Sequence, residues 1–304
     1  MTDLVHPYAP LYPHAGGVLH GKAVSVSGSS STTSSIGKFA VLDPIAETVR
    51  AFQMTPPSGY TFNHSLWGGA ADGRLWCVFQ GGTSGATAVM AVSIDTDGSH
   101  SFYPAPFTAY VTATLVTPDH VWALPAWDGI TAYAPQVFDI GTASWLTTSM
   151  SALVGNCQPV YAGGSVYHWA DDTLYRYSDS SFSRSTVATD VADYPAQSAQ
   201  AAIVGDLVYW RTRADDTLLI VLDTTDDSLS TLDVGVAFGL PLIYQPSESS
   251  FYSLDGTGGT LSVYSVDTHV SFTASTGFSH SPRNVGVMGH LAAGKVCFPV
   301  GHDI

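Results

Sequence analysis

The sequence predicts an all-β fold built from repeated short strands. Almost all of its acidic residues are Asp, with Glu47 and Glu248 as the exceptions, and Asp favours turns whereas Glu favours helices. Apolar and polar residues alternate with a period of two in segments such as LSVYSV at 261–266, a pattern typical of strands. No segment keeps a helical period. Together these observations favour strands joined by polar turns.

One pattern recurs along nearly the whole chain. A Gly or Asp turn leads into an apolar–aromatic pair, as in DGRLWCVF at 72–79 and GDLVYW at 205–210. Seven marker residues of this pattern are Val24, Trp76, Trp122, Tyr167, Tyr209, Tyr252 and Cys297. Their spacing of about 40–50 residues is that of a four-stranded propeller blade. The sequence therefore predicts a β-propeller of four-stranded antiparallel blades.

The second half of each unit is an apolar strand, a turn rich in Asp, Ser, Thr or Gly, and a more polar strand. The copies cover 39–52, 90–103, 135–149, 174–186, 219–232 and 261–273. Asp and Ser side chains hydrogen-bond the backbone of such turns, which explains their concentration there.

Two segments carry a resemblance to a known repeat. PQVFDIGTASWLTT at 135–148 resembles the second half of a kelch repeat, and LWCVFQGG at 75–82 resembles the preceding half with its double glycine. The double glycine that follows the aromatic strand occurs once, and the late Trp occurs only as Trp145. The resemblance implies a kelch-like β-propeller as a structural likeness, without a specific family.

The number of blades depends on the ends of the chain. Seven first-half pairs are matched by six second-half pairs, so the last pair at 285–300 lacks its outer half. We expect residues 1–15 to form an N-terminal closing arm, with 3–12 adding a strand to the last blade and 13–17 leading into the first. Closing the ring removes exposed strand edges. Residues 16–304 then form one propeller domain of seven blades, with six as the alternative.

Charge and motifs exclude several partners and cofactors. The formal net charge of −15 disfavours nucleic acid and anionic membranes. The three cysteines and eleven histidines lack the spacing of a disulfide framework or zinc site, and Cys77 and Cys297 read as buried apolar residues. DTDG at 95–98 and DTTDD at 223–227 are explained by turn geometry rather than calcium. We expect no metal, no cofactor and no membrane insertion. No signal peptide or membrane-spanning run is visible at the N-terminus.

The long connections are predicted to share one edge of the blades. In an antiparallel blade with strands A to D, the B–C and D–A connections leave on the opposite side from the A–B and C–D turns. The long segments 27–38, 56–64, 125–135, 188–198 and 276–284 all fall in the first set. Long loops on a rigid scaffold often carry binding. The candidate binding residues on these loops are Tyr60, Phe62, Trp127, Asp128, Tyr133, Tyr194 and Phe278. Packing under their own loops is the structural alternative for most of them.

Catalytic motifs are missing from the sequence. It contains no phosphate-binding glycine loop and no GxSxG nucleophile motif. SIDTDGSHSF at 93–102 is similar to the Asp box of sialidase propellers, which is structural in that family, and it has one residue too many before its aromatic. We expect a protein without enzymatic activity and assign no catalytic residue, although an Asp pair acting as acid and base stays open.

Composition and irregular repeats resemble propeller-type tail and receptor-binding proteins of tailed phages. The first functional hypothesis is therefore a non-enzymatic virion component, assembled in the host cytoplasm. Its long-loop face would contact a host surface glycan or protein, or neighbouring virion structural proteins. The alternative is a carbohydrate-active propeller enzyme, a glycoside hydrolase or lyase that uses Asp residues. A third hypothesis is a kelch-like protein-interaction scaffold.

Overall fold

The chain divides into two compact units, which are described separately below. The computed structural model describes residues 13–27, 37–58, 60, 64–83, 86–108, 111–125, 134–148, 150, 159–170, 172–195, 201–239, 242–254, 259–275, 290–292 and 295–297. The first unit comprises Met1–Val154 with Pro299–Ile304, and the second comprises Gly155–Phe298.

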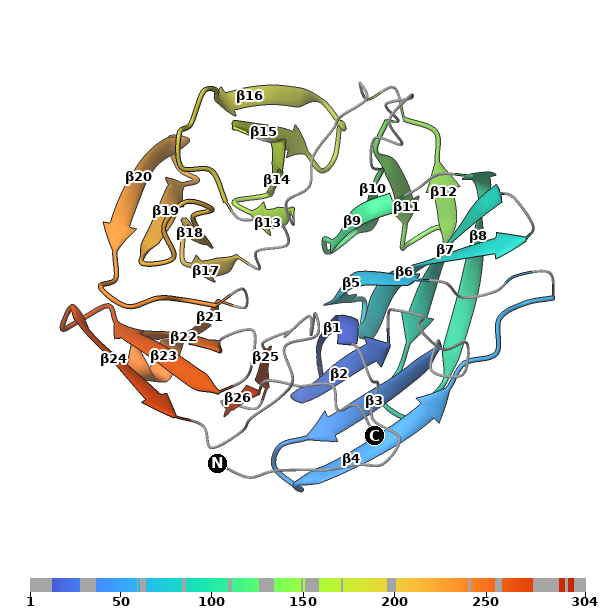
Figure 1. Ribbon diagram of the computed structural model, residues 1–304. Coiled ribbons are helices and arrows are strands. Elements are labelled where there is room, and N and C mark those ends of the chain that lie inside the picture. The colour runs from blue at the N-terminus through green and yellow to red at the C-terminus, as the bar shows by residue number, and fades with distance from the viewer. Residues whose placement is uncertain are drawn as a thin grey trace. The chain divides into compact units, whose positions relative to one another are not determined.

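The first unit contains three four-stranded antiparallel sheets, here called blades 1, 2 and 3 (Figure 1). Each has its strands in chain order. Blade 1 consists of β1 (Pro13–Leu19), β2 (Lys22–Ser27), β3 (Lys38–Asp43) and β4 (Thr48–Gln53). Blade 2 consists of β5 (His64–Ala71), β6 (Arg74–Thr83), β7 (Ala86–Ile94) and β8 (His100–Thr108). Blade 3 consists of β9 (Val111–Val116), β10 (His120–Pro125), β11 (Gln136–Asp139) and β12 (Ser144–Leu146).

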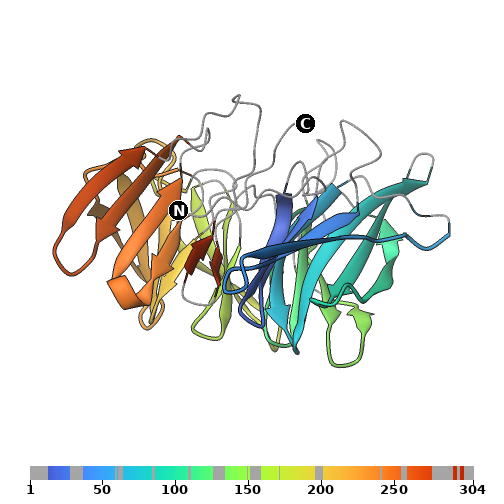
Figure 2. The ribbon, with the colours of Figure 1, turned by 90° about the horizontal axis from the view of Figure 1, so that it is seen from below.

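The second unit contains three further four-stranded sheets, blades 4, 5 and 6, and one two-stranded sheet. Blade 4 consists of β13 (Val160–Ala162), β14 (Ser165–Ala170), β15 (Thr173–Ser178) and β16 (Arg184–Ala188). Blade 5 consists of β17 (Ala202–Val204), β18 (Leu207–Arg211), β19 (Leu218–Asp223) and β20 (Ser228–Asp233). Blade 6 consists of β21 (Ile243–Gln245), β22 (Ser250–Leu254), β23 (Thr260–Ser265) and β24 (Val270–Ser275), and the pair is β25 (His290–Ala292) with β26 (Lys295–Cys297). Figure 2 shows these sheets from the side as twisted ribbons.

The predicted all-β class of four-stranded antiparallel blades is confirmed, with six such blades among the described residues. Six was the alternative to the preferred number of seven. All seven marker residues lie in the second strand of their sheets, from Val24 in β2 to Cys297 in β26. The segment expected to complete a seventh blade, residues 3–12, lies outside the described residues.

Residues 13–17 correct one expectation, because they form part of a strand rather than a connector. β1 pairs with β2 from Pro13 to Leu19. The segment PHAGG was misread because Pro and Gly are depleted in strands. Its glycine has a packing reason: a Cβ at Gly17 would lie 2.6 Å from Cδ1 of Leu75 in blade 2.

Side chains of the middle strands alternate between two neighbouring blades. In β6, Leu75, Cys77 and Phe79 belong to an apolar cluster shared with blade 1. Trp76 and Val78 belong to a cluster shared with blade 3. Because both faces are covered, the middle strands are apolar along their whole length. Burial inside this strand also raises the pKa of the Cys77 thiol, which keeps it neutral.

The second unit repeats this arrangement. Val208 and Trp210 of β18 pack in a cluster shared with blade 4, and Tyr209 between them packs in a cluster shared with blade 6. The outer strands are more exposed; in β24, Val270 and Phe272 are both more than half exposed. Burial therefore explains why the fourth strand of each repeat is the most polar in sequence.

The A–B and C–D turns are tight, and many of them contain residues with positive φ. Each C–D turn contains one residue with positive φ, namely Glu47, Gly98, Ala143, Phe182, Asp227 and His269. Three A–B turns have positive φ at both central residues, as at Asp72–Gly73, the conformation that matches the twist of a hairpin. The edge of the blades that carries these turns is called the short-turn edge below.

The opposite edge, called the long-loop edge, carries the B–C and D–A connections. No turn on the short-turn edge is longer than 95–99. The longest connections on the long-loop edge are 28–37, 54–63, 126–135, 147–159, 189–201, 234–242 and 276–289. The predicted asymmetry is confirmed, with short exceptions at 84–85, 109–110, 171–172 and 255–259.

Helical structure is limited to one short 3₁₀ turn, η1 (Pro246–Glu248), in the described part of the chain. No helix in that part has the length and apolar character needed to cross a membrane.

Gly98 provides a test of how a short turn packs on the neighbouring blade. Its φ is +100°, and a Cβ there would lie 2.4 Å from Cδ1 of Phe52, whose ring is stacked on Phe39 at 4.9 Å. Gly73 has a φ of +67° but open space around its Cα. We expect Gly73→Ala to lower the free energy of unfolding by about 1–2 kcal/mol through backbone strain alone. Gly98→Ala should lower the free energy of unfolding by about 1–3 kcal/mol more than Gly73→Ala does, because its methyl group also clashes with Phe52.

Chemical denaturation of both variants measures this difference. An equal decrease in the free energy of unfolding of the two variants would contradict the packing of the 95–99 turn against Phe52.

Candidate functional site

Asp carboxylates at the short-turn edge accept hydrogen bonds from backbone N–H groups of their own turns. Oδ1 of Asp43 accepts hydrogen bonds from the backbone N–H of Ile45 and Ala46, both at 3.0 Å. Oδ1 of Asp139 accepts one from the N–H of Thr142 at 2.7 Å. These backbone hydrogen bonds lower the pKa of both carboxyl groups. Such groups stay ionised near neutral pH, so they are poorly suited to act as general acids.

In the two calcium-like segments, 95–98 and 223–227, Asp side chains likewise accept hydrogen bonds from backbone N–H groups of the turn. Oδ1 of Asp97 accepts the N–H of Ser99 at 2.8 Å. In 223–227, Oδ1 of Asp223 accepts the N–H of Thr225 at 2.9 Å, and Oδ1 of Asp226 accepts the N–H of Ser228 at 2.9 Å. The described residues hold no group of three or more His, Cys, Asp or Glu side chains that could bind a metal ion.

The predicted binding residues are only partly placed by the structure. Tyr60 and Tyr194 lie among the described residues. The others, Phe62, Trp127, Asp128, Tyr133 and Phe278, lie outside the described residues. Whether the seven candidates form one surface therefore stays a prediction.

Tyr60 packs under its own connection. It is partly buried against the apolar cluster shared by blades 1 and 2, and its N–H donates to the carbonyl of Pro57 at 3.0 Å. This is the structural role that the sequence left open for these aromatics.

Tyr194 lies in a more elaborate arrangement between blades 4 and 5. Its ring packs against the cluster that contains Trp169 and Trp210. The guanidinium of Arg213 lies 5.5 Å from the ring centroid, and its Nη1 donates to the phenolic oxygen at 2.5 Å. The exposed Arg213 therefore covers part of the ring, which leaves less of it for stacking on a ligand.

The connection that carries Tyr194 is hydrogen-bonded to the connection before β15 of blade 4 and to the connection after β18 of blade 5. The N–H of Val191 donates to the carbonyl of Asp172 at 3.1 Å, just before β15. The N–H of Arg213 donates to the carbonyl of Tyr194 at 2.9 Å, and Pro195 pairs with Thr212 in an isolated bridge. Residues 189–195 thus form a strap across the long-loop edge of blades 4 and 5.

Beneath the strap lie two tryptophans with unused donors. Trp169 and Trp210 are fully buried and meet edge to face, with ring centroids 6.0 Å apart. The structure gives neither indole Nε1 a hydrogen-bond partner. A buried donor without an acceptor costs free energy. The seam between blades 4 and 5 therefore contains two unsatisfied N–H donors near the long-loop edge.

Sequence reasoning missed the charged residues at and after the end of β18. Arg211, Arg213, Asp215 and Asp216 lie within one stretch, WRTRADD at 210–216. Two arginines so close together are notable in a chain with ten basic residues in all. This local concentration of charge is the signal that could have located them.

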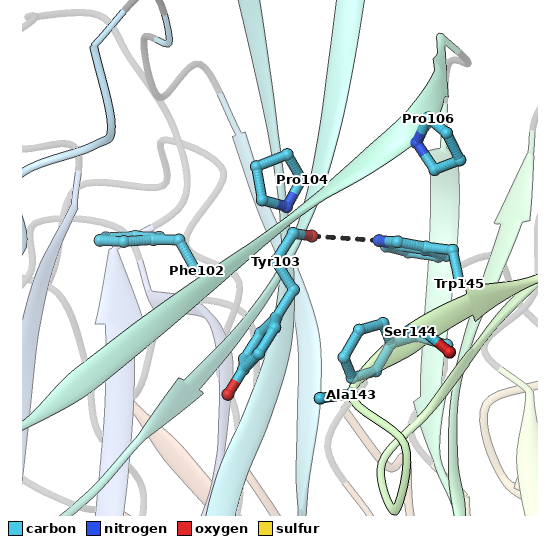
Figure 3. Close-up of a pocket in the computed structure, with 8 residues that line it drawn as sticks. Phe102, Tyr103, Pro104, Pro106, Ala143, Ser144 and Trp145 are labelled. Carbon is cyan, nitrogen blue, oxygen red and sulfur yellow. Dashed lines mark hydrogen bonds between the residues drawn. The ribbon is translucent and has the colours of Figure 1, made fainter.

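A separate hollow of about 370 Å³ lies between the outer strands of blades 2 and 3 (Figure 3). Its lining is aromatic and proline-rich, and Trp145 donates from Nε1 to the carbonyl of Tyr103 at 3.0 Å. Pro104 and Pro106 lie in the edge strand β8 and lack N–H donors, which discourages pairing with another strand. The hollow has no charged lining residue, so it can hold an apolar group but offers no acid or base.

Comparisons with known proteins identify the fold. No protein-family model matches the sequence, and no curated protein matches it either. Among solved structures, a streptogramin B lyase is 11% identical, with 99% of this chain and 94% of that chain covered and a TM-score of 0.68. A periplasmic gluconolactonase of Pseudomonas aeruginosa is 11% identical, with coverage of 95% and 89% and a TM-score of 0.60. The Pan2 WD40 domain of Neurospora crassa is 12% identical, with coverage of 94% and 85% and a TM-score of 0.61.

These likenesses show that the chain has a β-propeller fold. At such low identity they carry nothing further, and neither the kelch resemblance nor the likeness to phage tail proteins has support from them.

The strap predicts different effects for two substitutions of Tyr194. Tyr194→Ala removes a partly buried ring, and we expect it to lower the free energy of unfolding by about 1–2 kcal/mol. It should also increase quenching of tryptophan fluorescence by acrylamide, because Trp169 and Trp210 lose their cover. Tyr194→Phe keeps the ring and its contact with Arg213, so stability should change by less than about 1 kcal/mol.

Thermal unfolding and quenching of the two variants provide the measurement. An unchanged quenching constant in Tyr194→Ala would show that residues 189–195 do not shield the tryptophan pair.

Proposed function

We propose that this propeller is a non-enzymatic binding protein and that its ligand lies at the long-loop edge. The observation that supports this most is the unequal use of the two edges. One edge consists of short hydrogen-bonded turns, and the other carries the long connections. Loops of that kind on a rigid scaffold are the usual place for recognition.

The state of the described carboxylates supports a role without catalysis. Asp43, Asp97 and Asp139 have a lowered pKa because backbone N–H groups donate to them. Catalytic acids need the opposite environment, in which burial or a like charge raises the pKa.

The proposed setting is a tailed-virus particle. The chain would act as a minor tail or surface protein that contacts a host surface glycan or neighbouring structural subunits. The support is the low content of charged residues, the Ser-, Thr- and Gly-rich strands and the irregular repeats. Aromatic rings on the long connections suit sugars, because a flat ring can stack on a pyranose.

A second candidate is the carbohydrate-active enzyme that uses Asp residues. A streptogramin B lyase and a gluconolactonase have the same propeller fold, so the fold is compatible with an enzyme. A protein-interaction scaffold is the third possibility, and the Pan2 WD40 domain shows the same fold. Turnover of a lactone or glycan panel by the purified chain would favour the enzyme and contradict the main proposal.

Binding to immobilised bacterial surface glycans tests the proposal directly. The variants are Tyr194→Ala on the long-loop edge and Ile45→Ala on the short-turn edge, where Ile45 is 75% exposed. We expect the unmodified chain and Ile45→Ala to bind equally. Tyr194→Ala should bind at least about fivefold more weakly, a loss of roughly 1 kcal/mol of binding free energy, because it loosens the 189–195 strap on the proposed binding edge.

Mass spectrometry of purified particles tests the setting. The chain should be present in tailed-virus particles from a host that carries its gene. Absence from the particles, or glycan binding that is lost only in Ile45→Ala, would overturn the corresponding part of the proposal.

A further inference from the structure

Arg211 is a partly buried cation that forms no salt bridge within the described part of the chain. It ends β18, where Tyr209 and Arg211 face blade 6 and Trp210 faces blade 4. Its Nη1 donates weakly to the carbonyl of Phe238 at 3.4 Å. Its Nε is shielded from solvent and has no hydrogen-bond partner in the described structure. Burial lowers the pKa of its guanidinium.

Ser253 lies on the facing blade with a second unused polar atom. It sits in β22 on the same face as Phe251, which packs in the cluster shared with blade 5. The residue is fully buried, and its Oγ has no hydrogen-bond partner. A Cβ built on Gly239 would lie 3.1 Å from this oxygen.

Both residues border the same short stretch of the connection 234–242. Arg211 reaches the carbonyl of Phe238, and Ser253 lies beside the next residue, Gly239. The neighbouring Ser262 donates from Oγ to the carbonyl of Ala237 at 2.6 Å. Residues 237–239 therefore lie beside the polar atoms of both residues in the seam between blades 5 and 6.

The preceding seam shows that this position is systematic. There, Trp169 at the end of β14 meets Trp210 of β18 beneath the 189–195 strap. Trp169 corresponds to Arg211, and Trp210 corresponds to Ser253, when the blades are aligned on Tyr167, Tyr209 and Tyr252. An aromatic pair in one seam is thus replaced by a cation and a hydroxyl in the next.

We propose that the seam between blades 5 and 6 binds a carboxylate group, held by Arg211 and Ser253 at the long-loop edge. Nε–H and Nη2–H of Arg211 form a fork that matches two carboxylate oxygens. Ser253 Oγ–H supplies a third donor. The carboxylate supplies the charge that a partly buried guanidinium requires.

Arg211 Nε and Ser253 Oγ are shielded from solvent. The ligand therefore has to displace residues 237–239 to reach them. This inference deepens the proposed binding function, since it names the group that the long-loop edge recognises. It does not depend on a viral setting. An acidic sugar and an acidic peptide side chain both present the required group.

Thermal unfolding at constant ionic strength, with sodium chloride exchanged for sodium acetate, tests the site itself. We expect acetate to raise the Tm saturably, because an anion that binds only the folded chain stabilises it. Glucuronate and N-acetylaspartate, used in the same way, distinguish a sugar source from a peptide source by which of them gives the lower half-saturation concentration.

Arg211→Gln should weaken acetate binding by about tenfold or more, the value of a hydrogen-bonded charge. Arg213→Gln is the matched control, because it removes the same charge two residues away and should leave binding unchanged. Ser253→Ala should weaken binding while raising the Tm without ligand, since it removes an unsatisfied hydroxyl. Asp216→Asn should strengthen binding, because the Asp216 carboxylate acts on Arg211 electrostatically.

A Tm that responds alike to acetate and chloride would overturn the inference. An equal response in Arg211→Gln and the unmodified chain would also overturn it. Loss of glycan binding with retained acetate binding would instead overturn the proposed function and leave this site standing.

Discussion

The two-sided packing of the middle strands is the constraint on which the rest of the structure depends. Successive residues of β6 and β18 enter clusters on opposite sides of their sheets. A shift of one residue in the register of such a strand would exchange the two sets of side chains. Trp76 and Cys77 illustrate the consequence, since an indole and a thiol would have to change places between seams of different shape.

This constraint divides the remaining residues into two roles. At the short-turn edge, Asp side chains cap backbone N–H groups and one residue in each C–D turn adopts positive φ. These turns keep the strands in register. At the long-loop edge of the second unit, residues 189–195 and 237–239 lie over two seams. Polar atoms of Trp169, Trp210, Arg211 and Ser253 have no hydrogen-bond partner there. Buried polar groups are normally satisfied, so their concentration at one edge of the second unit marks where a ligand would be accommodated.

Much of the fold could be predicted from the sequence, because its determinants are local. The second strands were found from Trp76, Tyr167 and Tyr209, whose alternation and spacing follow from burial on both faces. The C–D turns were found from Asp residues such as Asp43 and Asp139. Strand β1 was not found, because glycine at Gly17 is required by the approach of Leu75, a contact between segments far apart in sequence.

The candidate site was less predictable for the same physical reason. Tyr194 was found because it lies on a long loop, but its partner Arg213 belongs to the connection of another blade. Arg211 and Ser253 are more than forty residues apart, about one blade, and look like an ordinary strand end and an ordinary strand residue. The three-dimensional structure is needed to see that Arg211 Nε and Ser253 Oγ are buried near residues 237–239 and lack hydrogen-bond partners. Sequence periodicity locates such positions in a blade but not what faces them across a seam.

Native-state hydrogen exchange tests the two-sided packing most directly. If neighbouring sheets share their middle-strand side chains, amides of β6, β7 and β10 in the first unit should lose protection together as denaturant is added, with one common opening free energy. Outer-strand amides of β4 and β12 should open at lower free energies. Independent opening of β6 and β7, with β10 still protected at its original level, would contradict the account.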